Sequence, residues 1–138
     1  MPAVATLIDT GPMVASLNAR DPDHDACKVA FSKLSPFAYT CWPVVTEVVY
    51  LLGNYSVATT KLFELLRQQT YRLLPLSQAD NQAIETILAR YKDQDFQLAD
   101  ACLMHLAERE GITEVLTLDR RDFSVFRTSL GKSLTLLP

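Results

Sequence analysis

Residues 3–14 read AVATLIDTGPMV, and this stretch decides the fold class. A strongly apolar segment, Ala3 to Ile8, runs directly into Asp9, and Pro12 stands where a helix can begin. Aspartate is a common helix cap, because its side chain accepts hydrogen bonds from free amides at the helix start. Taken alone, Asp9 is better explained as such a cap than as a functional acid, so the rest of the chain must decide.

The pattern of an apolar run followed by a helical segment recurs along the chain. Helix-period segments separate further strand-like runs at residues 37–42, 71–76, 114–119 and 134–138. This alternation favours an α/β domain with a mainly parallel sheet. Helix limits are indicated by a turn at 53–56, by Ser77 with Asp80 three residues later as a capping pair, and by Gly111 as a helix end.

The length and composition fit one compact domain over residues 1–138, with 49% hydrophobic residues to form an ordinary core. The longest apolar runs are too short to cross a bilayer, and Asp9 interrupts the N-terminal run before it could serve as the core of a signal peptide. We therefore expect a cytoplasmic protein with no membrane partner.

Cysteine and histidine give no sign of a metal or disulfide site. Cys27, Cys41 and Cys102 are widely spaced, and none forms a CxxC pair, so we expect them to be small buried hydrophobes. The only histidines, His24 and His105, are too few for a zinc enzyme.

The net charge of −3 gives no overall attraction to nucleic acid. Any such contact must rest on a local basic patch, and one candidate lies near the C-terminus. It comprises Arg120, Arg121, Arg127 and Lys132. Scattered charges on a solvated surface explain these residues at least as well.

Four acids stand at unusual places. Asp119 ends the apolar run VLTLD, as Asp9 ends its own, and ligands of parallel α/β sheets bind beyond the carboxyl ends of strands. Glu47 and Asp100 fall at helical positions whose neighbours three and four residues away are mainly apolar, with no lysine or arginine within one turn. An ionised carboxylate facing a core is unfavourable by several kcal/mol, roughly, unless it is paired, protonated or bound to a metal.

We expect these four carboxylates to converge at one edge of the sheet. Without counter-charges they would repel one another, so the group is best explained as a site for divalent cations. An all-oxygen ligand set favours Mg²⁺ or Mn²⁺ over Zn²⁺. Thr10 and Thr117 flank the acids and could orient them by hydroxyl hydrogen bonds.

The chain resembles the PIN-domain family, and within it the VapC-like toxins of type II toxin–antitoxin pairs. The resemblance covers nearly the whole chain and rests on four segments in the family's order: LIDTGPMVA, TEVVYLL, LADACLMHLAER and LTLDRRDF. It implies helices on both sides of a mainly parallel sheet, a three-layer α/β/α arrangement. It also implies a Mg²⁺- or Mn²⁺-dependent ribonuclease, often a homodimer, that is inhibited by a small antitoxin protein inserted into the active-site groove.

Transferred residue by residue, the resemblance makes Asp9 and Asp100 direct metal ligands, with Glu47 and Asp119 completing the acidic pocket. Asp122 matches a second acid of the last segment and is auxiliary. The spacing of acids before Asp100 departs from the family pattern, so Asp93 is assigned no role. Two explanations stay open for Asp95: an acid at the rim of the pocket, or a residue at a helix start.

The expected reaction is cleavage of single-stranded RNA by a water that the bound cation activates, with no nucleophilic side chain. Arg120, Arg121 and Arg127 would hold the phosphate backbone, a contact that carries no sequence information.

Two other functions are compatible with parts of the pattern. Phosphoryl transfer to an acid, as in haloacid-dehalogenase-like phosphatases, would require a second aspartate two residues after Asp9, where this chain has Gly11; a receiver domain would require a late lysine that LTLLP lacks. The alternative from another class is a PIN-like binding or scaffold module with weak or no activity. Keeping four acids that are unfavourable without a metal argues against it.

Overall fold

The computed structural model describes residues 5–34, 38–129 and 131–137. A five-stranded sheet forms the centre of the molecule, with the strand order β3-β2-β1-β4-β5 and parallel pairing throughout. Its strands are β1 (Thr6–Ile8), β2 (Ala38–Thr40), β3 (Arg72–Leu73), β4 (Glu114–Leu116) and β5 (Thr135–Leu137).

All five predicted strands are present, and each is shorter than the apolar run that indicated it. Residues 3, 4, 37 and 138 of those runs lie outside the described residues. Composition marks a strand by its apolar side chains, whereas the strand itself ends where pairing ends, and β1 pairs with β4 only from Thr6 to Ile8.

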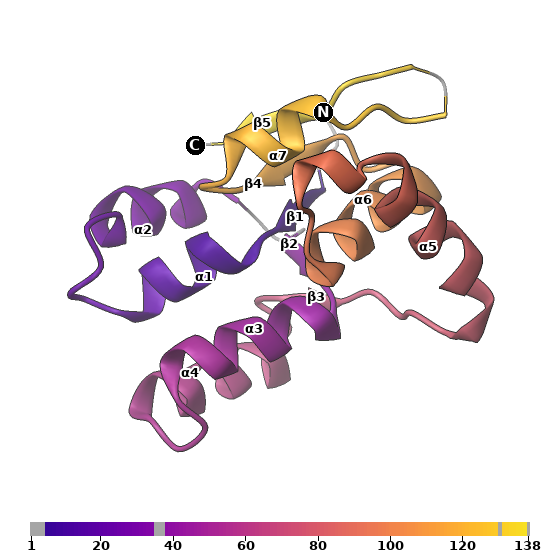
Figure 1. The fold of residues 1–138 in the computed structure, drawn as a ribbon. Helices are drawn as coiled ribbons and strands as arrows, with labels where there is room; N and C mark the ends of the chain where they lie inside the picture. Colours follow the sequence, from indigo (N-terminus) through magenta and orange to yellow (C-terminus); the bar gives the residue numbers. More distant parts are fainter. Residues whose placement is uncertain (1–4, 35–37, 130, 138) are drawn as a thin grey trace.

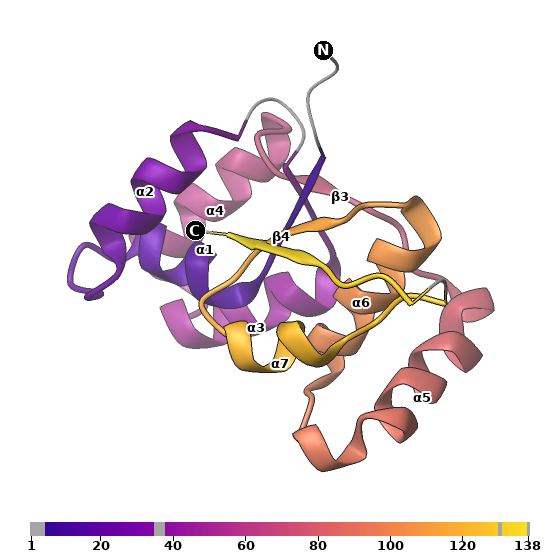
Figure 2. The same ribbon diagram turned by 90° about the horizontal axis from the view of Figure 1, so that it is seen from above.

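The helices lie on both sides of the sheet. In Figures 1 and 2, α1 and α2 lie on one side of the strands and α5 and α6 on the other, so the fold has three layers. This confirms the α/β/α prediction. The helices are α1 (Thr10–Leu17), α2 (His24–Ser32), α3 (Trp42–Leu52), α4 (Val57–Arg67), α5 (Asn81–Arg90), α6 (Leu98–Glu110) and α7 (Arg120–Val125), with 3₁₀ turns at Gln78–Asp80 and Lys92–Gln94.

Local signals placed most helix limits correctly. The turn at 53–56 separates α3 from α4, and Gly111 ends α6 with a left-handed φ of 67°. The capping box of Ser77 and Asp80 is also confirmed. The first helix differs, because α1 begins at Thr10, before the proline that was expected to start it.

The core lies between the central strands and the two helix layers. It contains Leu7, Ile8, Val115 and Leu116 from β1 and β4, and eight of the thirteen residues of α6 are buried. All three cysteines are buried thiols, as predicted. Among the described residues, no helix is long and apolar enough to cross a membrane.

Candidate active site

The four predicted acids gather at the carboxyl end of the central strands. Adjacent strands β1 and β4 lead into Asp9 and Asp119, and the backbone amide of Asp9 donates to the carbonyl of Leu116 at 3.0 Å. Asp100 is the third residue of α6, and Glu47 lies on α3, which packs against α6. In Figure 1, the start of α1 lies between α7 above it and α3 below it.

Asp9 is buried, with 5% of its surface exposed. It occupies the N-cap position of α1 but makes no side-chain capping bond. Its Oδ2 instead accepts a hydrogen bond of 2.8 Å from the Thr117 hydroxyl. Burial raises the pKa of Asp9 to about 6, and the charges of Glu47 and Asp119 act in the same direction. The cap explanation therefore describes the place of Asp9 in the chain but not the contacts of its carboxylate.

Asp100 is the second buried acid of the group, with 8% of its surface exposed. Its Oδ2 accepts a hydrogen bond of 3.0 Å from the backbone amide of Gln97. Burial raises its pKa to about 6, with further contributions from the charges of Asp9, Glu47 and Asp119. The Gln97 amide was not predicted as part of the site. Its only signal in the sequence is the capping spacing, three residues before an acid.

Glu47 differs in part from the prediction. It is half-buried, and its Oε1 accepts a hydrogen bond of 2.8 Å from the Thr10 hydroxyl. The expectation that its apolar neighbours face the core is wrong for Tyr50 and Leu51, which are 83% and 60% exposed. Helix α3 buries the face formed by Val44, Val45 and Val48, and Glu47 lies beside that face.

Asp119 and Asp122 form a pair at the start of α7. The Asp119 side chain caps this helix by accepting a 3.2 Å hydrogen bond from the Asp122 amide. The pKa of Asp122 rises to about 6, first through burial and then through its hydrogen bond with Asp119 and the charges of Asp119 and Asp100. Asp122 thus belongs to the same group of interacting acids.

Two hydroxyl groups connect acids that come from distant parts of the chain. The Thr117 hydroxyl donates to Asp9 and also accepts a 2.8 Å hydrogen bond from the Asp119 amide, so it joins the ends of β1 and β4. The Thr10 hydroxyl joins α1 to Glu47 on α3. Both threonines therefore orient carboxylates, as their positions in the sequence predicted.

No described ion pair neutralises the four acids. The ion pairs of the structure lie elsewhere, at Asp80, Glu64 and Glu110. Salt bridging, the simplest explanation for the acids on helices, is therefore not observed in the described part of the chain.

The donor set of this site is chemically suited to a hard divalent cation. It offers carboxylate and hydroxyl oxygens with unneutralised like charges, which is the environment that Mg²⁺ and Mn²⁺ prefer. Among the described residues, however, no three histidine, cysteine, aspartate or glutamate side chains are arranged so that they could hold one ion as they stand. The residue types therefore suit a divalent cation, but the side chains must move before they can bind one.

Three of the predicted basic residues lie near the two ends of α7. Arg120 and Arg121 lie in the first turn of α7, directly after Asp119, and both are exposed. Arg127 lies beyond the end of α7, and its Nη1 donates to the carbonyls of Ser124 and Phe126 at 2.7 and 2.8 Å. Of the three arginines, Arg120 and Arg121 are the ones next to an acid of the site along the chain.

Two acids before α6, Asp93 and Asp95, are exposed. Asp93 lies in the 3₁₀ turn Lys92–Gln94, and Asp95 follows it with a left-handed φ of 57°. Asp95 precedes the N-cap residue Gln97, so it is not the first residue of the helix.

Comparison with known proteins identifies the family of the chain. The PIN domain family model matches residues 6–127. Ribonuclease VapC26 of Mycobacterium tuberculosis is 31% identical over 134 residues, which are 96% of this chain and 99% of that protein.

Two solved structures are similar in fold. VapC20 of M. tuberculosis, described as a sarcin-ricin loop cleaving toxin, has a TM-score of 0.77 at 18% identity, covering 85% of this chain and 92% of that one. A toxin–antitoxin complex from Klebsiella pneumoniae has a TM-score of 0.68 at 20% identity, covering 88% and 92%. At these identities the likeness concerns the fold, whereas the family match spans most of the sequence. The chain belongs to the PIN-domain family.

Proposed function

We propose that this protein is a divalent-metal-dependent endoribonuclease that cleaves single-stranded RNA, and that it is the toxin of a toxin–antitoxin pair. The observation that supports this most strongly is the group of acids at the end of β1 and β4. Two of them are buried with pKa values raised to about 6, and no described ion pair neutralises them. The near full-length similarity to a protein named as a ribonuclease gives independent support.

Asp9 and Asp100 are the proposed direct metal ligands, and Glu47 and Asp119 complete the acidic pocket. A divalent cation bound there would supply Lewis-acid activation of a water molecule and neutralise negative charge on the phosphodiester. The donor types favour Mg²⁺, with Mn²⁺ able to replace it.

The protein's own residues hold these ligands in place. Thr117 fixes one oxygen of Asp9, the Gln97 amide fixes one oxygen of Asp100, and Thr10 fixes one oxygen of Glu47. Orientation of this kind reduces the entropy lost when a ligand binds.

Positive charge for the substrate comes from the start of α7. Arg120 and Arg121 follow Asp119 directly and would contact RNA phosphates next to the cleaved bond. An antitoxin protein and a second copy of the chain are the further proposed partners. The proposal places the protein in the cytoplasm, where its RNA substrate is found.

The test is cleavage of bacterial RNA and of labelled single-stranded oligonucleotides by purified protein free of antitoxin. We expect cleavage with Mg²⁺ or Mn²⁺ and none with EDTA. Asp9→Asn and Asp100→Asn should reduce the rate at least about a hundredfold, because they remove proposed ligands. Asp25→Asn is the matched control, since Asp25 is an exposed acid on α2.

The proposal is refuted if the protein cuts no RNA with either metal, or if both asparagine variants cut as fast as the wild type. Calorimetric titration with Mn²⁺ then distinguishes a metal-binding enzyme from the remaining alternative. Absence of binding would favour a PIN-like binding or scaffold module.

A further inference from the structure

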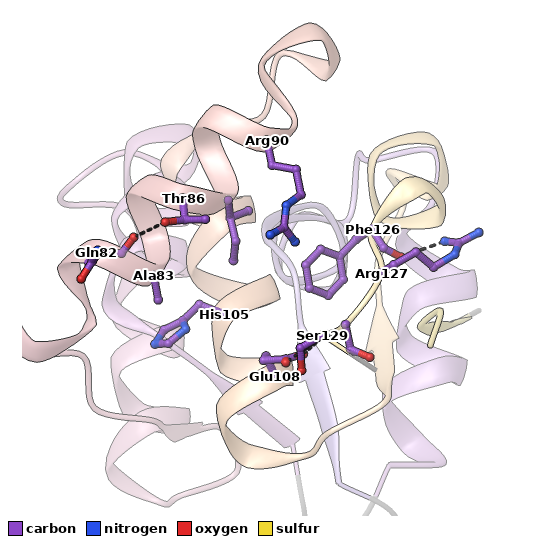
Figure 3. Close-up of a pocket in the computed structure, with 11 residues that line it drawn as sticks. Gln82, Ala83, Thr86, Arg90, His105, Glu108, Phe126, Arg127 and Ser129 are labelled. Carbon is purple, nitrogen blue, oxygen red and sulfur yellow. Dashed lines mark hydrogen bonds between the residues drawn. The ribbon is translucent and has the colours of Figure 1, made fainter. Parts of the chain in front are cut away.

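An open cavity lies outside the acidic site. It has a volume of about 620 Å³ and is bordered by α5, α6 and residues 126–129 (Figure 3). None of the four predicted acids lines it. Its volume falls in the range of roughly 300–1,000 Å³ that is typical of small-molecule pockets.

The cavity has apolar walls and a polar mouth. Ala83, Ile87 and Phe126 supply apolar surface, and exposed Thr86 and Ser129 supply hydroxyl groups. A few polar groups around an apolar floor are the usual composition of a ligand site. A ligand with a flat apolar part and a polar or charged part would match both surfaces.

The ionisable side chains that line the cavity already have hydrogen-bond partners, with one exception. Both oxygens of Glu108 accept hydrogen bonds from the Ser129 amide, at 3.0 and 3.1 Å. His105 is bound to Asp80 at 2.7 Å, and the Nη1 of Arg127 is bound to two backbone carbonyls.

Arg90 is the exception. Its side chain makes no hydrogen bond or ion pair within the described residues 5–34, 38–129 and 131–137. Figure 3 shows its side chain reaching from the end of α5 toward Phe126, whereas the guanidinium of Arg127 points away. A guanidinium with unused donors at the mouth of a cavity is suited to a phosphate group.

The walls of the cavity are held firmly together. Asp80 accepts hydrogen bonds from Arg109 at 3.1 Å and pairs with His105, so it ties the start of α5 to α6. The Tyr91 hydroxyl accepts a hydrogen bond of 3.1 Å from the Arg127 amide. The cavity is therefore formed before any ligand arrives, which lowers the entropy lost on binding.

The cavity is also close to the acidic site. Helix α6 carries Asp100 near its start and Glu108 eight residues later, a separation of about 12 Å at a rise of about 1.5 Å per residue. A strand of RNA that is cut at the acids can therefore reach the cavity with a nucleotide that flanks the cleaved bond.

We propose that this cavity binds such a flanking nucleotide of the RNA substrate, with the Arg90 guanidinium bound to its phosphate and the base against the apolar walls. Arg90 is then a substrate-binding residue. This inference rests on the proposed ribonuclease function, and it adds a subsite that none of the predicted site residues forms.

The experiment measures binding of a labelled single-stranded RNA to the full chain in EDTA, where no cleavage occurs. We expect Arg90→Ala to weaken binding about tenfold and to lower the slope of log K against log salt concentration by about 0.7, the value for one phosphate contact on a single strand. Arg90→Lys should retain part of the affinity. Thr86→Trp, which fills the cavity mouth and removes no charge, should weaken binding as strongly as Arg90→Ala.

Arg67→Ala is the matched control, because Arg67 is an exposed arginine at the end of α4, outside the cavity. We expect it to leave binding unchanged. Melting temperatures of all variants should match the wild type, since Arg90, Thr86 and Arg67 are exposed.

Each result that contradicts the expectation identifies which proposal is wrong. Equal RNA binding by wild type, Arg90→Ala and Thr86→Trp overturns the inference. A second result would be that Arg90→Ala abolishes the binding of adenosine monophosphate but leaves RNA binding unchanged. In that case the cavity binds free nucleotides, and its assignment as an RNA subsite is wrong. If RNA binds through Arg90 but is never cut with Mg²⁺ or Mn²⁺, the ribonuclease proposal fails and the subsite remains. In a cutting enzyme, Arg90→Ala should raise KM for long RNA and leave kcat unchanged.

Discussion

Replacing Asp9 with asparagine should stabilise the metal-free protein while it abolishes cleavage. The carboxylate of Asp9 is buried among other acids, and burial raises its pKa from 3.8 to about 6. Asparagine has nearly the same shape, carries no charge and keeps an acceptor for the Thr117 hydroxyl. The substitution therefore removes an unfavourable charge with little change in packing.

The size of the effect follows from the pKa. A shift from 3.8 to about 6 corresponds to about 3 kcal/mol by which folding disfavours the ionised form of Asp9. Asparagine has only one acceptor oxygen, and the lost hydrogen-bonding capacity costs about 1 kcal/mol. We therefore expect the free energy of unfolding to rise by about 2 kcal/mol in EDTA.

The effect must also depend on pH with a defined sign. Because the pKa of Asp9 is higher in the folded protein than in the unfolded chain, the ionised group destabilises the fold above about pH 6. The destabilisation is lost as the pH falls from about 6 through 3.8, because Asp9 becomes protonated in both states below that pH. The advantage of asparagine should be complete near pH 8 and nearly absent near pH 4.

The assay is urea unfolding in EDTA at both pH values, with Asp25→Asn as the control. That exposed substitution should change the free energy of unfolding by no more than about 0.5 kcal/mol. A variant of Asp9 that is less stable than the wild type near pH 8, or whose gain persists near pH 4, would refute the reasoning. The first outcome would mean that a contact absent from the structure stabilises the carboxylate, and the second that the gain does not come from removing its charge.

Three further outcomes test the site and its support. Saturating Mn²⁺, at about 100 times its dissociation constant, should raise the free energy of unfolding of the wild type by about 2.7 kcal/mol, and Asp9→Asn should lose this gain in calorimetry. Thr117→Val removes the hydroxyl that donates to Asp9, so kcat/KM for RNA cleavage should fall about tenfold or more while far-ultraviolet circular dichroism is unchanged. Asp80→Asn should lower the melting temperature near neutral pH and have less effect in acid, because its partners His105 and Arg109 hold the pKa of Asp80 well below its usual range; thermal unfolding across pH measures this.

The sequence predicted the features of the site that depend only on neighbouring residues along the chain. Asp9 and Asp119 each end an apolar run, and that alone places them at the carboxyl edge of a parallel sheet. Asp100 has apolar neighbours at helical spacing, and it is buried in α6. In both cases the local pattern and the tertiary position coincide because strands and helices repeat regularly.

Those features that depend on tertiary packing were not readable. The helical neighbours of Glu47 are apolar, yet Tyr50 and Leu51 face solvent, because α3 offers three valines on another face to the core. The hydrogen bond between Thr117 and Asp9 joins residues 108 positions apart, and only the pairing of β1 with β4 brings them together. Periodicity shows that a face is apolar but not whether another element covers it.

Helix α6 contributes residues both to the acidic site and to the cavity that Arg90 lines. Eight of its thirteen residues are buried, so it cannot shift without disturbing the core. Asp100 lies near its start, and His105 and Glu108 form a wall of the cavity farther along. A nucleotide held in the cavity would thus lie at a fixed distance from the acids. Arg90, on the exposed end of α5, would hold a flanking phosphate equally in the ground state and in the transition state, so its loss should raise KM and leave kcat unchanged.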